Sequence, residues 1–220
     1  MEIDKAIKDM QRGKFVLIHD SAGRENEIDL AIAAEKVRPA DVARMRMDGG
    51  GLICLALSAG IANKLKLPFI QDVYKKSGME IFRALKADDI PYDEKSSFSL
   101  SINHRKTFTG ITDKDRALTI HKLGRLARHP SPAAFGKNFR TPGHIHTLIS
   151  SGIEIRHGHT ELSTALAEMS GVTPAVAICE MMDARTHRAL SLSKAKDYAR
   201  RNHFALVDTN EILDCWEAHR

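Results

Sequence analysis

Short apolar runs alternate with amphipathic stretches through the last third of this sequence, and this alternation restricts the possible folds more than any other feature. Strands are predicted at 146–149, 175–179 and 204–207, and helices from Thr160 to Gly171, near 193–202, and from a cap at Thr209 onward. Such short apolar runs suit strands buried between layers, because helices need longer segments. The alternation therefore predicts a sheet covered by helices.

The sequence before residue 146 adds elements less evenly. Strands are predicted at 15–18, 30–34, 52–57 and 97–103, and helices over the first dozen residues, over 40–47, and after a cap at Thr112 or Asp113. Between 59 and 93 the pattern weakens to a short helix and a long connection. No repeat or long linker divides the chain, so we expect a single domain over 1–220 with a mixed β-sheet flanked by helices in layers.

Charge and composition limit the classes of partner. The 220 residues include 33 basic and 28 acidic side chains, for a net charge of +5, and the basic residues are scattered rather than gathered in one stripe. Aromatic residues make up only 5%, which leaves few side chains on which nucleic-acid bases could stack. An anionic small molecule accounts for the positive charge equally well, so we expect no nucleic-acid partner.

Cysteine spacing and the lengths of apolar runs indicate the compartment. Cys54, Cys179 and Cys215 form no C-x-x-C pair and no thiolate zinc spacing, which argues against a disulfide framework. The charged N-terminal segment lacks the apolar core of a signal peptide, and no run approaches the roughly 18 apolar residues of a membrane span. We expect a cytoplasmic protein with no membrane partner.

The densest chemical signal is the hexapeptide RENEID at 24–29, between two predicted strands. Side chains of an extended segment repeat with a period of two, so Glu25, Glu27 and Asp29 would share one side. Converging carboxylates suit a hard cation such as Mg²⁺ or Mn²⁺, and they can also remove a proton from a carbon beside a carbonyl. The alternative is a solvated hairpin turn, since charge clusters are usually exposed.

A second signal is the sequence RHGHTE at 156–161, at the start of a predicted helix. A helix N-terminus presents unpaired N–H groups and a partial positive charge, so Arg156 and Thr160 could hold a phosphate there. His159 offers a nitrogen ligand to a metal. The simpler alternative is that Thr160 only caps the helix and the histidines lie on the surface.

Three isolated residues also deserve a chemical interpretation. His144 follows a predicted Pro-Gly turn at the start of a strand, where an imidazole could exchange protons near neutral pH. Glu180 ends the apolar run 175–179, a position where α/β proteins commonly place ligand groups, and a metal or a substrate hydroxyl would supply the partner that a buried carboxylate needs. Cys54 lies in the middle of an apolar strand, which is typical of a small core residue.

Taken in order, six motifs resemble the signature series of the 3,4-dihydroxy-2-butanone 4-phosphate synthases. They are RENE-x-D at 24–29, GLIC at 51–54, GIT at 110–112 followed by DR at 115–116, PGH at 142–144, GHTE at 158–161 and CE at 179–180. Together they span nearly the whole chain, and six ordered motifs are far more specific than any one. The version TGITD at 109–113 is similar to the monofunctional archaeal branch.

The resemblance implies a three-layer α+β sandwich and a homodimer with active sites near the subunit interface. It also implies a carbon–carbon lyase of riboflavin biosynthesis, which converts D-ribulose 5-phosphate to L-3,4-dihydroxy-2-butanone 4-phosphate and formate with two Mg²⁺ (or Mn²⁺) ions per active site. Such ions would stabilise an enediolate and steer the dehydration and carbon shift that follow.

The resemblance also assigns roles to individual residues. Glu25 and His159 would hold the metals. His144 and Glu180 would be essential to catalysis, with Glu27 and Cys54 as further catalytic candidates lining the site. The expected substrate contacts are Arg24, Glu25, Asp29, Arg156, His157, Gly158, His159, Thr160 and Glu180.

Two other functions remain open from the sequence. A basic nucleic-acid-binding module on a related layered fold would gather its basic residues on one concave face. A metal-dependent sugar-phosphate isomerase or aldolase could use the same carboxylates and histidines to form an enediolate. Product analysis separates these possibilities, because only the synthase expels C4 of the pentose as formate.

Overall fold

A mixed sheet of seven strands forms the centre of the computed structural model, which describes residues 1–85, 89–91, 93 and 95–219. The strand order is β4-β5-β3-β6-β2-β1-β9. The pairs β3–β5 and β1–β9 are parallel and the other neighbours are antiparallel. The strands are β1 (Val16–His19), β2 (Ile28–Ala33), β3 (Cys54–Leu57), β4 (Phe98–His104), β5 (Phe139–Ile149), β6 (Ala175–Glu180) and β9 (Ala205–Asp208), with a separate hairpin of β7 (Met182–Asp183) and β8 (Arg188–Ala189).

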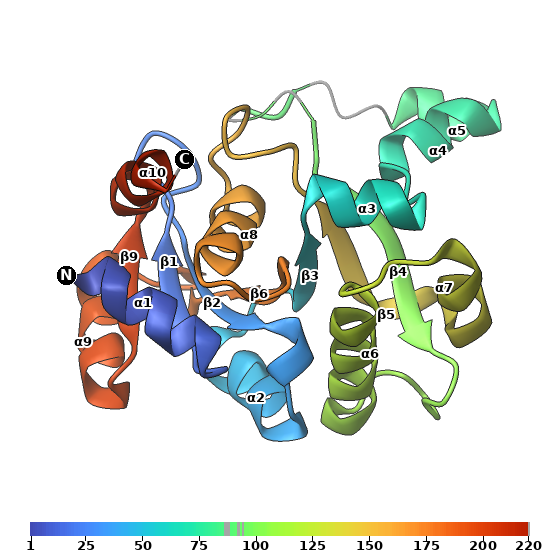
Figure 1. The fold of residues 1–220 in the computed structure, drawn as a ribbon. Coiled ribbons are helices and arrows are strands. Elements are labelled where there is room, and N and C mark those ends of the chain that lie inside the picture. The colour runs from blue at the N-terminus through green and yellow to red at the C-terminus, as the bar shows by residue number, and fades with distance from the viewer. Residues whose placement is uncertain (86–88, 92, 94, 220) are drawn as a thin grey trace.

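Helices cover both faces of this sheet, as Figure 1 shows. Successive strand residues point to opposite faces, so two separate cores form. Ile18, Ala31 and Val176 belong to the core beneath the helices α1 (Glu2–Gln11), α8 (His159–Met169) and α10 (Thr209–Ala218). Leu17 and Leu30 belong to the core beneath α2 (Pro39–Arg44), α6 (Asp113–Leu126) and α9 (Leu192–Asn202). The three-layer α+β architecture with a mixed sheet is thus confirmed.

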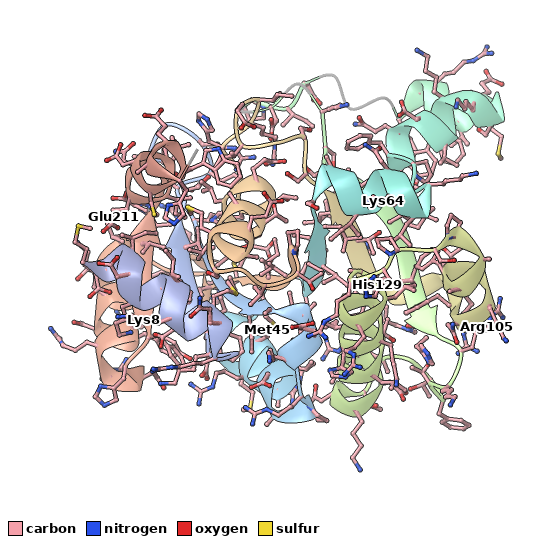
Figure 2. All side chains as sticks on the ribbon, viewed as in Figure 1. Lys8, Met45, Lys64, Arg105, His129 and Glu211 are labelled. Atoms are coloured by element: carbon pink, nitrogen blue, oxygen red, sulfur yellow. The ribbon has the colours of Figure 1, made fainter. Side chains whose placement is uncertain are left out.

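Side-chain exposure follows these layers. Figure 2 labels Met45, which is fully buried, together with Lys8, Lys64 and Arg105, which are exposed. Met45 begins a short π-helix (Met45–Gly49) that continues α2, so the helical segment extends beyond the predicted end at 47. In the part of the chain that the structure describes, no helix has the length and apolar character needed to cross a lipid bilayer.

The segment from 59 to 93 differs from its prediction. Instead of one short helix it contains three, α3 (Ala59–Leu65), α4 (Ile70–Ser77) and α5 (Glu80–Ala84). Residues 86–88 and 92, which belong to the predicted long connection, lie outside the described residues. Short helices were hard to predict here because Pro68 and Gly78 divide the apolar pattern into pieces of one or two turns.

Two caps were predicted, and one is correct. The Thr112 hydroxyl accepts a hydrogen bond from the Asp115 N–H at the start of α6, as predicted. At α10 the N-cap is Asp208 rather than Thr209. Asp208 and Glu211 each accept the other's backbone N–H, which forms a capping box. The carboxylate one residue earlier therefore takes the capping position.

The strand β5 contains a large bulge where a Pro-Gly turn had been predicted. Ile102 of β4 pairs with Ile145, yet the next residue, Asn103, pairs with Arg140. Residues 141–144 therefore bulge out of the ladder inside β5, and the prediction that the strand starts only at 146 was wrong. A glycine is required in the bulge, because a Cβ on Gly143 would lie 1.9 Å from the carbonyl carbon of Ile102. The bulge carries His144 to the protein surface. The helix α7 (Pro132–Asn138) directly precedes β5, and its Phe135 stacks on Phe139 at the start of that strand.

Candidate active site

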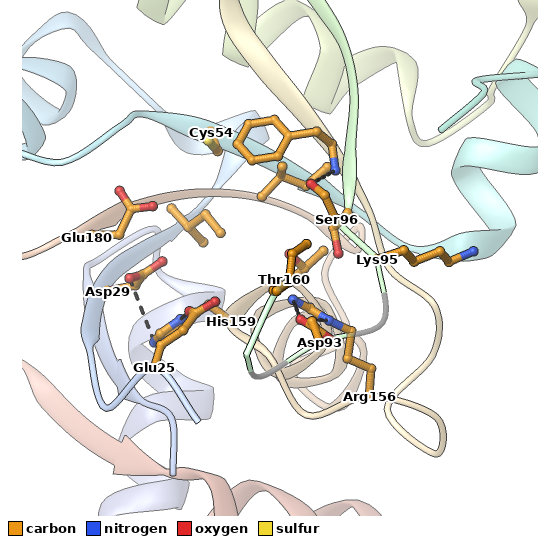
Figure 3. Close-up of a pocket in the computed structure, with 15 residues that line it drawn as sticks. Glu25, Asp29, Cys54, Asp93, Lys95, Ser96, Arg156, His159, Thr160 and Glu180 are labelled. Carbon is orange, nitrogen blue, oxygen red and sulfur yellow. Dashed lines mark hydrogen bonds and ion pairs between the residues drawn. The ribbon is translucent and has the colours of Figure 1, made fainter. Parts of the chain in front are cut away.

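A cavity of about 190 Å³ lies beside the N-terminus of α8, on the sheet face that this helix covers (Figure 3). The cavity collects side chains from both signals of the sequence, the acidic hexapeptide and the start of α8. Predicted site residues in its lining are Glu25, Asp29, Cys54, Arg156, His159, Thr160 and Glu180. Residues of the segment before β4, including Asp93, Lys95 and Ser96, complete one wall.

The remaining predicted site residues do not line this cavity. Arg24 contacts it indirectly through an ion pair with Asp93, and the backbone oxygen of Glu27 lies 3.2 Å from the His159 Nε2. Gly158 is the N-cap of α8. His157 and His144 are exposed and absent from the lining.

One side of the cavity is acidic. Asp29 and Glu180 lie directly opposite each other on β2 and β6, and their carboxylates face the cavity (Figure 3). The ring of His159 lies between two acids, with Nδ1 3.4 Å from Glu25 Oε2 and Nε2 3.7 Å from Asp29 Oδ1. These side chains come from a loop, two strands and a helix, so only the folded chain brings them together.

Electrostatics in this acidic side favour added positive charge. Burial raises the pKa of Asp29 to about 8, and the neighbouring carboxylates add to the rise although His159 opposes it. Burial would lower the pKa of His159, but Asp29, Glu25 and Asp20 outweigh it and raise the pKa to about 9. Both shifts show that protons bind tightly to a buried excess of negative charge. A divalent cation would neutralise the same charge.

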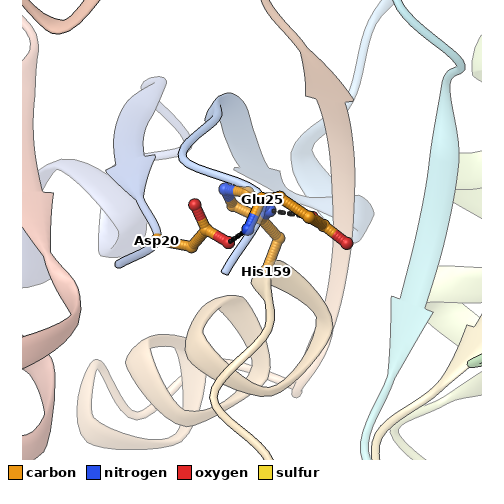
Figure 4. A group of neighbouring side chains, drawn as sticks. All are labelled: Asp20, Glu25 and His159. Carbon is orange, nitrogen blue, oxygen red and sulfur yellow. Dashed lines mark hydrogen bonds and ion pairs between the residues drawn. The ribbon is translucent and has the colours of Figure 1, made fainter. Parts of the chain in front are cut away.

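The acidic side fits a hard metal ion. Asp29 Oδ1 is buried and has no hydrogen-bond partner among the described residues, so it is an acceptor that still needs a donor or a cation. Ligand atoms of Asp20, Glu25 and His159 lie within 4.8 Å of one another (Figure 4). Carboxylate oxygens with one imidazole nitrogen form a donor set that Mg²⁺ and Mn²⁺ accept.

Asp20 has a second duty in this group. Its side chain is fully buried and accepts hydrogen bonds from the Glu25 N–H at 3.1 Å, the Glu27 N–H at 2.9 Å and the Arg24 Nη1 at 3.1 Å. These bonds fix the acidic hexapeptide as a folded loop rather than a solvated hairpin turn. Both Asp20 oxygens therefore already accept hydrogen bonds, and Asp20 holds the loop that carries Glu25.

The opposite side of the cavity is basic. Arg156 donates to Glu161, which is fully buried, and to Asp93, while Arg24 Nη2 donates to Asp93 at 2.7 Å. Figure 3 shows Arg156, Asp93 and Thr160 across the cavity from Glu180. The cavity is thus polarised, with the Asp29 and Glu180 carboxylates at one end and the Arg156 guanidinium at the other. Arg24 joins the two sides, because its Nη1 lies 2.9 Å from Glu25 Oε2.

The N-terminus of α8 adds to the basic side. Its N-cap is Gly158, and no side chain caps it. Thr160 therefore does not serve as the cap, and this buried residue lines the cavity instead. Unpaired N–H groups in the first helical turn and the partial positive charge of the helix end make this position suitable for an anion such as a phosphate.

Glu180 and Cys54 occupy the sheet floor of the cavity. Glu180 Oε2 accepts the Leu52 N–H at 2.8 Å, which fixes the carboxylate at the end of β6. Cys54 is only 2% exposed, and burial raises the pKa of its thiol well above the ordinary value. A thiol that stays protonated is a poor nucleophile, so Cys54 contributes shape to the cavity.

Comparisons with known proteins identify the family. The family model for 3,4-dihydroxy-2-butanone 4-phosphate synthase matches residues 4–215. The chain belongs to this synthase family. It is 43% identical to the synthase of Methanothermobacter thermautotrophicus, covering 99% of this chain and 97% of that one, and 45% identical to the synthase of Archaeoglobus fulgidus, covering 100% and 96%.

Solved structures of the synthase family share the fold. A cation-free synthase superposes with a TM-score of 0.78 at 28% identity, covering 98% of this chain and 97% of that chain. A synthase in complex with two magnesium ions gives a TM-score of 0.75 at 28% identity, covering 96% and 94%. The resemblance inferred from the six motifs is therefore confirmed.

His144 is held in one orientation although it lies outside the cavity. Its backbone N–H donates to Asn103 Oδ1 at 2.9 Å, so the other end of that amide, Nδ2, is the one that faces the His144 Nδ1 at 3.0 Å. Oδ1 also lies 3.4 Å from Nδ1, but the shorter contact with the donor Nδ2 favours Nδ1 as the acceptor, with the proton of the neutral ring on Nε2. The synthase fold thus presents an oriented histidine at its surface.

Sequence reasoning missed four residues that organise these groups: Asp20, Asp93, Asn103 and Glu161. Glu161 stands inside a quoted motif, and Asp20 lies four residues before Arg24, so both could have been considered as partners of the nearby arginines. Asp93 and Asn103 gave no local signal. Their contacts join segments 41 to 69 positions apart, and such pairings depend on the tertiary fold.

Proposed function

We propose that this protein converts D-ribulose 5-phosphate to L-3,4-dihydroxy-2-butanone 4-phosphate and formate. The two products together contain every atom of the substrate, so the reaction needs no oxidant, reductant or second substrate. The observation that carries the proposal is the polarised cavity. Carboxylates and His159 at one end suit the reacting carbonyl and hydroxyl groups, while Arg156 and Thr160 at the other suit the phosphate.

We assign two Mg²⁺ ions to the acidic end, with Mn²⁺ as the alternative, and Glu25 and His159 as the residues that hold them. The unpaired oxygen of Asp29 and the raised pKa values of Asp29 and His159 support a cation there. A solved relative that binds two magnesium ions supports the number. Such ions supply Lewis-acid stabilisation of an enediolate.

The protein's own residues divide the remaining work. Arg24, Arg156 and Thr160 bind and orient the phosphate, and Asp29 binds a substrate hydroxyl. Glu180, fixed by the Leu52 N–H, is placed to move a proton at its remaining oxygen. Burial raises the pKa of Glu27 above its ordinary value, the direction that suits a carboxyl group acting as an acid.

We further propose a homodimer in which His144 completes the active site of the other subunit. The support is the position of His144: it is exposed, absent from the cavity lining and yet held by Asn103 with its protonated Nε2 available. A residue so fixed has a defined partner, and a second copy of this chain supplies one. We also propose the cytoplasm as the compartment, which the three unpaired cysteines support.

The test of the reaction is a formate assay on ribulose 5-phosphate with Mg²⁺, repeated with EDTA. We expect EDTA, Glu25→Ala and His159→Ala each to abolish turnover. Glu80→Ala and His129→Ala remove the same side chains from exposed positions outside the cavity and should remain fully active. Full activity in either cavity variant would contradict the proposed metal site. Isomerised pentose phosphate without formate would identify an isomerase instead.

The shared active site is tested by mixing two inactive variants. If each site takes His144 from one subunit and Glu25 from the other, then reassociated His144→Ala and Glu25→Ala chains form heterodimers with one intact site. Activity should return on mixing although each variant alone is inactive. No recovery from subunits shown to exchange would place His144 and Glu25 of one chain in the same site.

A further inference from the structure

Asp93 occupies an unusual position between two arginines of the cavity wall. Its Oδ2 atom alone accepts three hydrogen bonds, from Arg24 Nη2 at 2.7 Å, from Arg156 Nε at 2.8 Å and from Arg156 Nη2 at 2.6 Å. Only 14% of the Asp93 side chain is exposed. One carboxylate oxygen thus occupies N–H groups of both guanidinium ions.

The two guanidinium groups need an anion between them. They lie close enough that the charge of Arg24 disfavours that of Arg156, and both side chains are largely buried. Burial would raise the pKa of Asp93, but hydrogen bonds from Arg156 and Arg24 outweigh it and hold the pKa below the ordinary value. Asp93 is therefore an ionised carboxylate that bridges two like charges.

We propose that Asp93 is an internal anion that occupies the place of the substrate's phosphate until a phosphate displaces it. This inference rests on the proposed function. The place that Asp93 occupies adjoins Thr160 and the uncapped N-terminus of α8 in the same cavity lining. A phosphate oxygen placed against both arginines would meet the N–H groups that Asp93 now uses, so the two anions exclude each other.

Charge explains why a phosphate can displace the Asp93 carboxylate from the two arginines, whereas a ligand without an anionic group cannot. A phosphate monoester carries about −1.5 to −2 charges near neutral pH and three acceptor oxygens, whereas Asp93 carries one charge. A phosphate can bridge both arginines and also reach Thr160 and the α8 N–H groups. A sugar without phosphate has no group that replaces the Asp93 carboxylate. Asp93 therefore competes with phosphorylated ligands and not with ligands that lack an anionic group.

The test measures binding of inorganic phosphate and of ribose 5-phosphate by calorimetry, without divalent metal. We expect Asp93→Ala and Asp93→Asn to bind both ligands about ten-fold more tightly than the unchanged protein, because the competing anion is gone. Asp93→Asn keeps the side-chain shape, and the thermal midpoint of each variant reports whether it folds. Ribose, which lacks a phosphate, should show no gain.

A matched control separates this local effect from a change of net charge. Asp113 also bridges two arginines, Arg46 and Arg116, each at 3.1 Å, but it lies at the start of α6, outside the cavity lining. Asp113→Ala therefore adds the same positive charge at another site, and it should leave phosphate affinity unchanged. An equal gain in the Asp113 variant would overturn the proposal.

Weaker or unchanged phosphate binding in folded Asp93 variants would also overturn it, since Asp93 would then hold the arginines in place for the ligand. Neither result affects the formate assay on the unchanged protein. If that assay yields no formate while the Asp93 variants bind phosphate more tightly, the competition between Asp93 and phosphate is supported and the proposed reaction is wrong.

Discussion

Asp29 lies directly opposite Glu180 in the antiparallel pairing of β2 with β6. Like charges at opposed positions destabilise a sheet, and burial increases the cost because solvent cannot screen them. Asp29 and Glu180 are the only charged residues of these two central strands, whose other residues are apolar. The fold thus tolerates a repulsion that a bound cation would relieve.

Neutralising one of the two carboxylates should stabilise the metal-free protein while it removes activity. Glu180→Gln keeps an oxygen that can accept the Leu52 N–H, and it removes the repulsion from Asp29. At a pH above about 8, where Asp29 is ionised, we expect a gain of roughly 0.2–1 kcal/mol in the free energy of unfolding in EDTA, measured by thermal denaturation, and we also expect loss of formate production. Glu80→Gln, an exposed change on α5, should alter neither quantity. A lower thermal midpoint for Glu180→Gln would contradict this account.

The stability of the metal-free protein should fall as the pH rises from about 6 to 9. The pKa of His159 is raised to about 9 and that of Asp29 to about 8. A raised folded-state pKa gives stability that is complete below the unfolded pKa and is lost as the pH passes through the folded value. Mg²⁺ should restore the thermal midpoint at high pH, because it replaces the protons.

Asp29→Asn isolates the carboxylate's share of this pH dependence. Below about pH 4, the ordinary pKa of an aspartate in the unfolded chain, Asp29 carries a proton in both states, so the variant should have a similar thermal midpoint there. As the pH rises, the midpoint of the variant should fall less steeply. Parallel curves for the two proteins in EDTA would show that Asp29 does not titrate in this range.

The sequence predicted the layers and the acidic end of the site better than the basic end. Short apolar runs located most strands, because successive residues such as Leu17 and Ile18 face different cores and both must be apolar. Glu25 and His159 stand in compact motifs, so their chemistry was visible locally. Asp93 was not, because it reaches the arginines from a segment whose apolar pattern is broken by prolines. Long-range ion pairs of this kind leave no periodic signal.

The close approach of Gly51 to Glu180 allows a test that removes no polar side chain. A Cβ on Gly51 would lie 2.4 Å from Glu180 Oε2 and 2.8 Å from the Glu180 backbone oxygen. Gly51→Ala should therefore move the carboxylate and reduce formate production by about 10²-fold or more, as misplacement of a reacting group does. Gly60→Ala in α3, where a Cβ meets nothing within 4 Å, should remain fully active. Equal activities would show that the position of Glu180 is not critical.

Asn103 should prove necessary for activity although it does not touch the cavity. Asn103→Asp keeps an acceptor for the His144 backbone N–H but replaces the donating Nδ2 with an oxygen that faces Nδ1. The neutral ring would then carry its proton on Nδ1, so Nε2 would lose the proton that it presents. We expect formate production to fall by about 10²-fold, and nitrogen NMR should report the changed tautomer. Asn138→Asp, the same substitution at an exposed position on α7, serves as the control and should be fully active with an unchanged His144 signal. A normal rate in Asn103→Asp together with the altered tautomer would show that His144 takes no part in proton transfer.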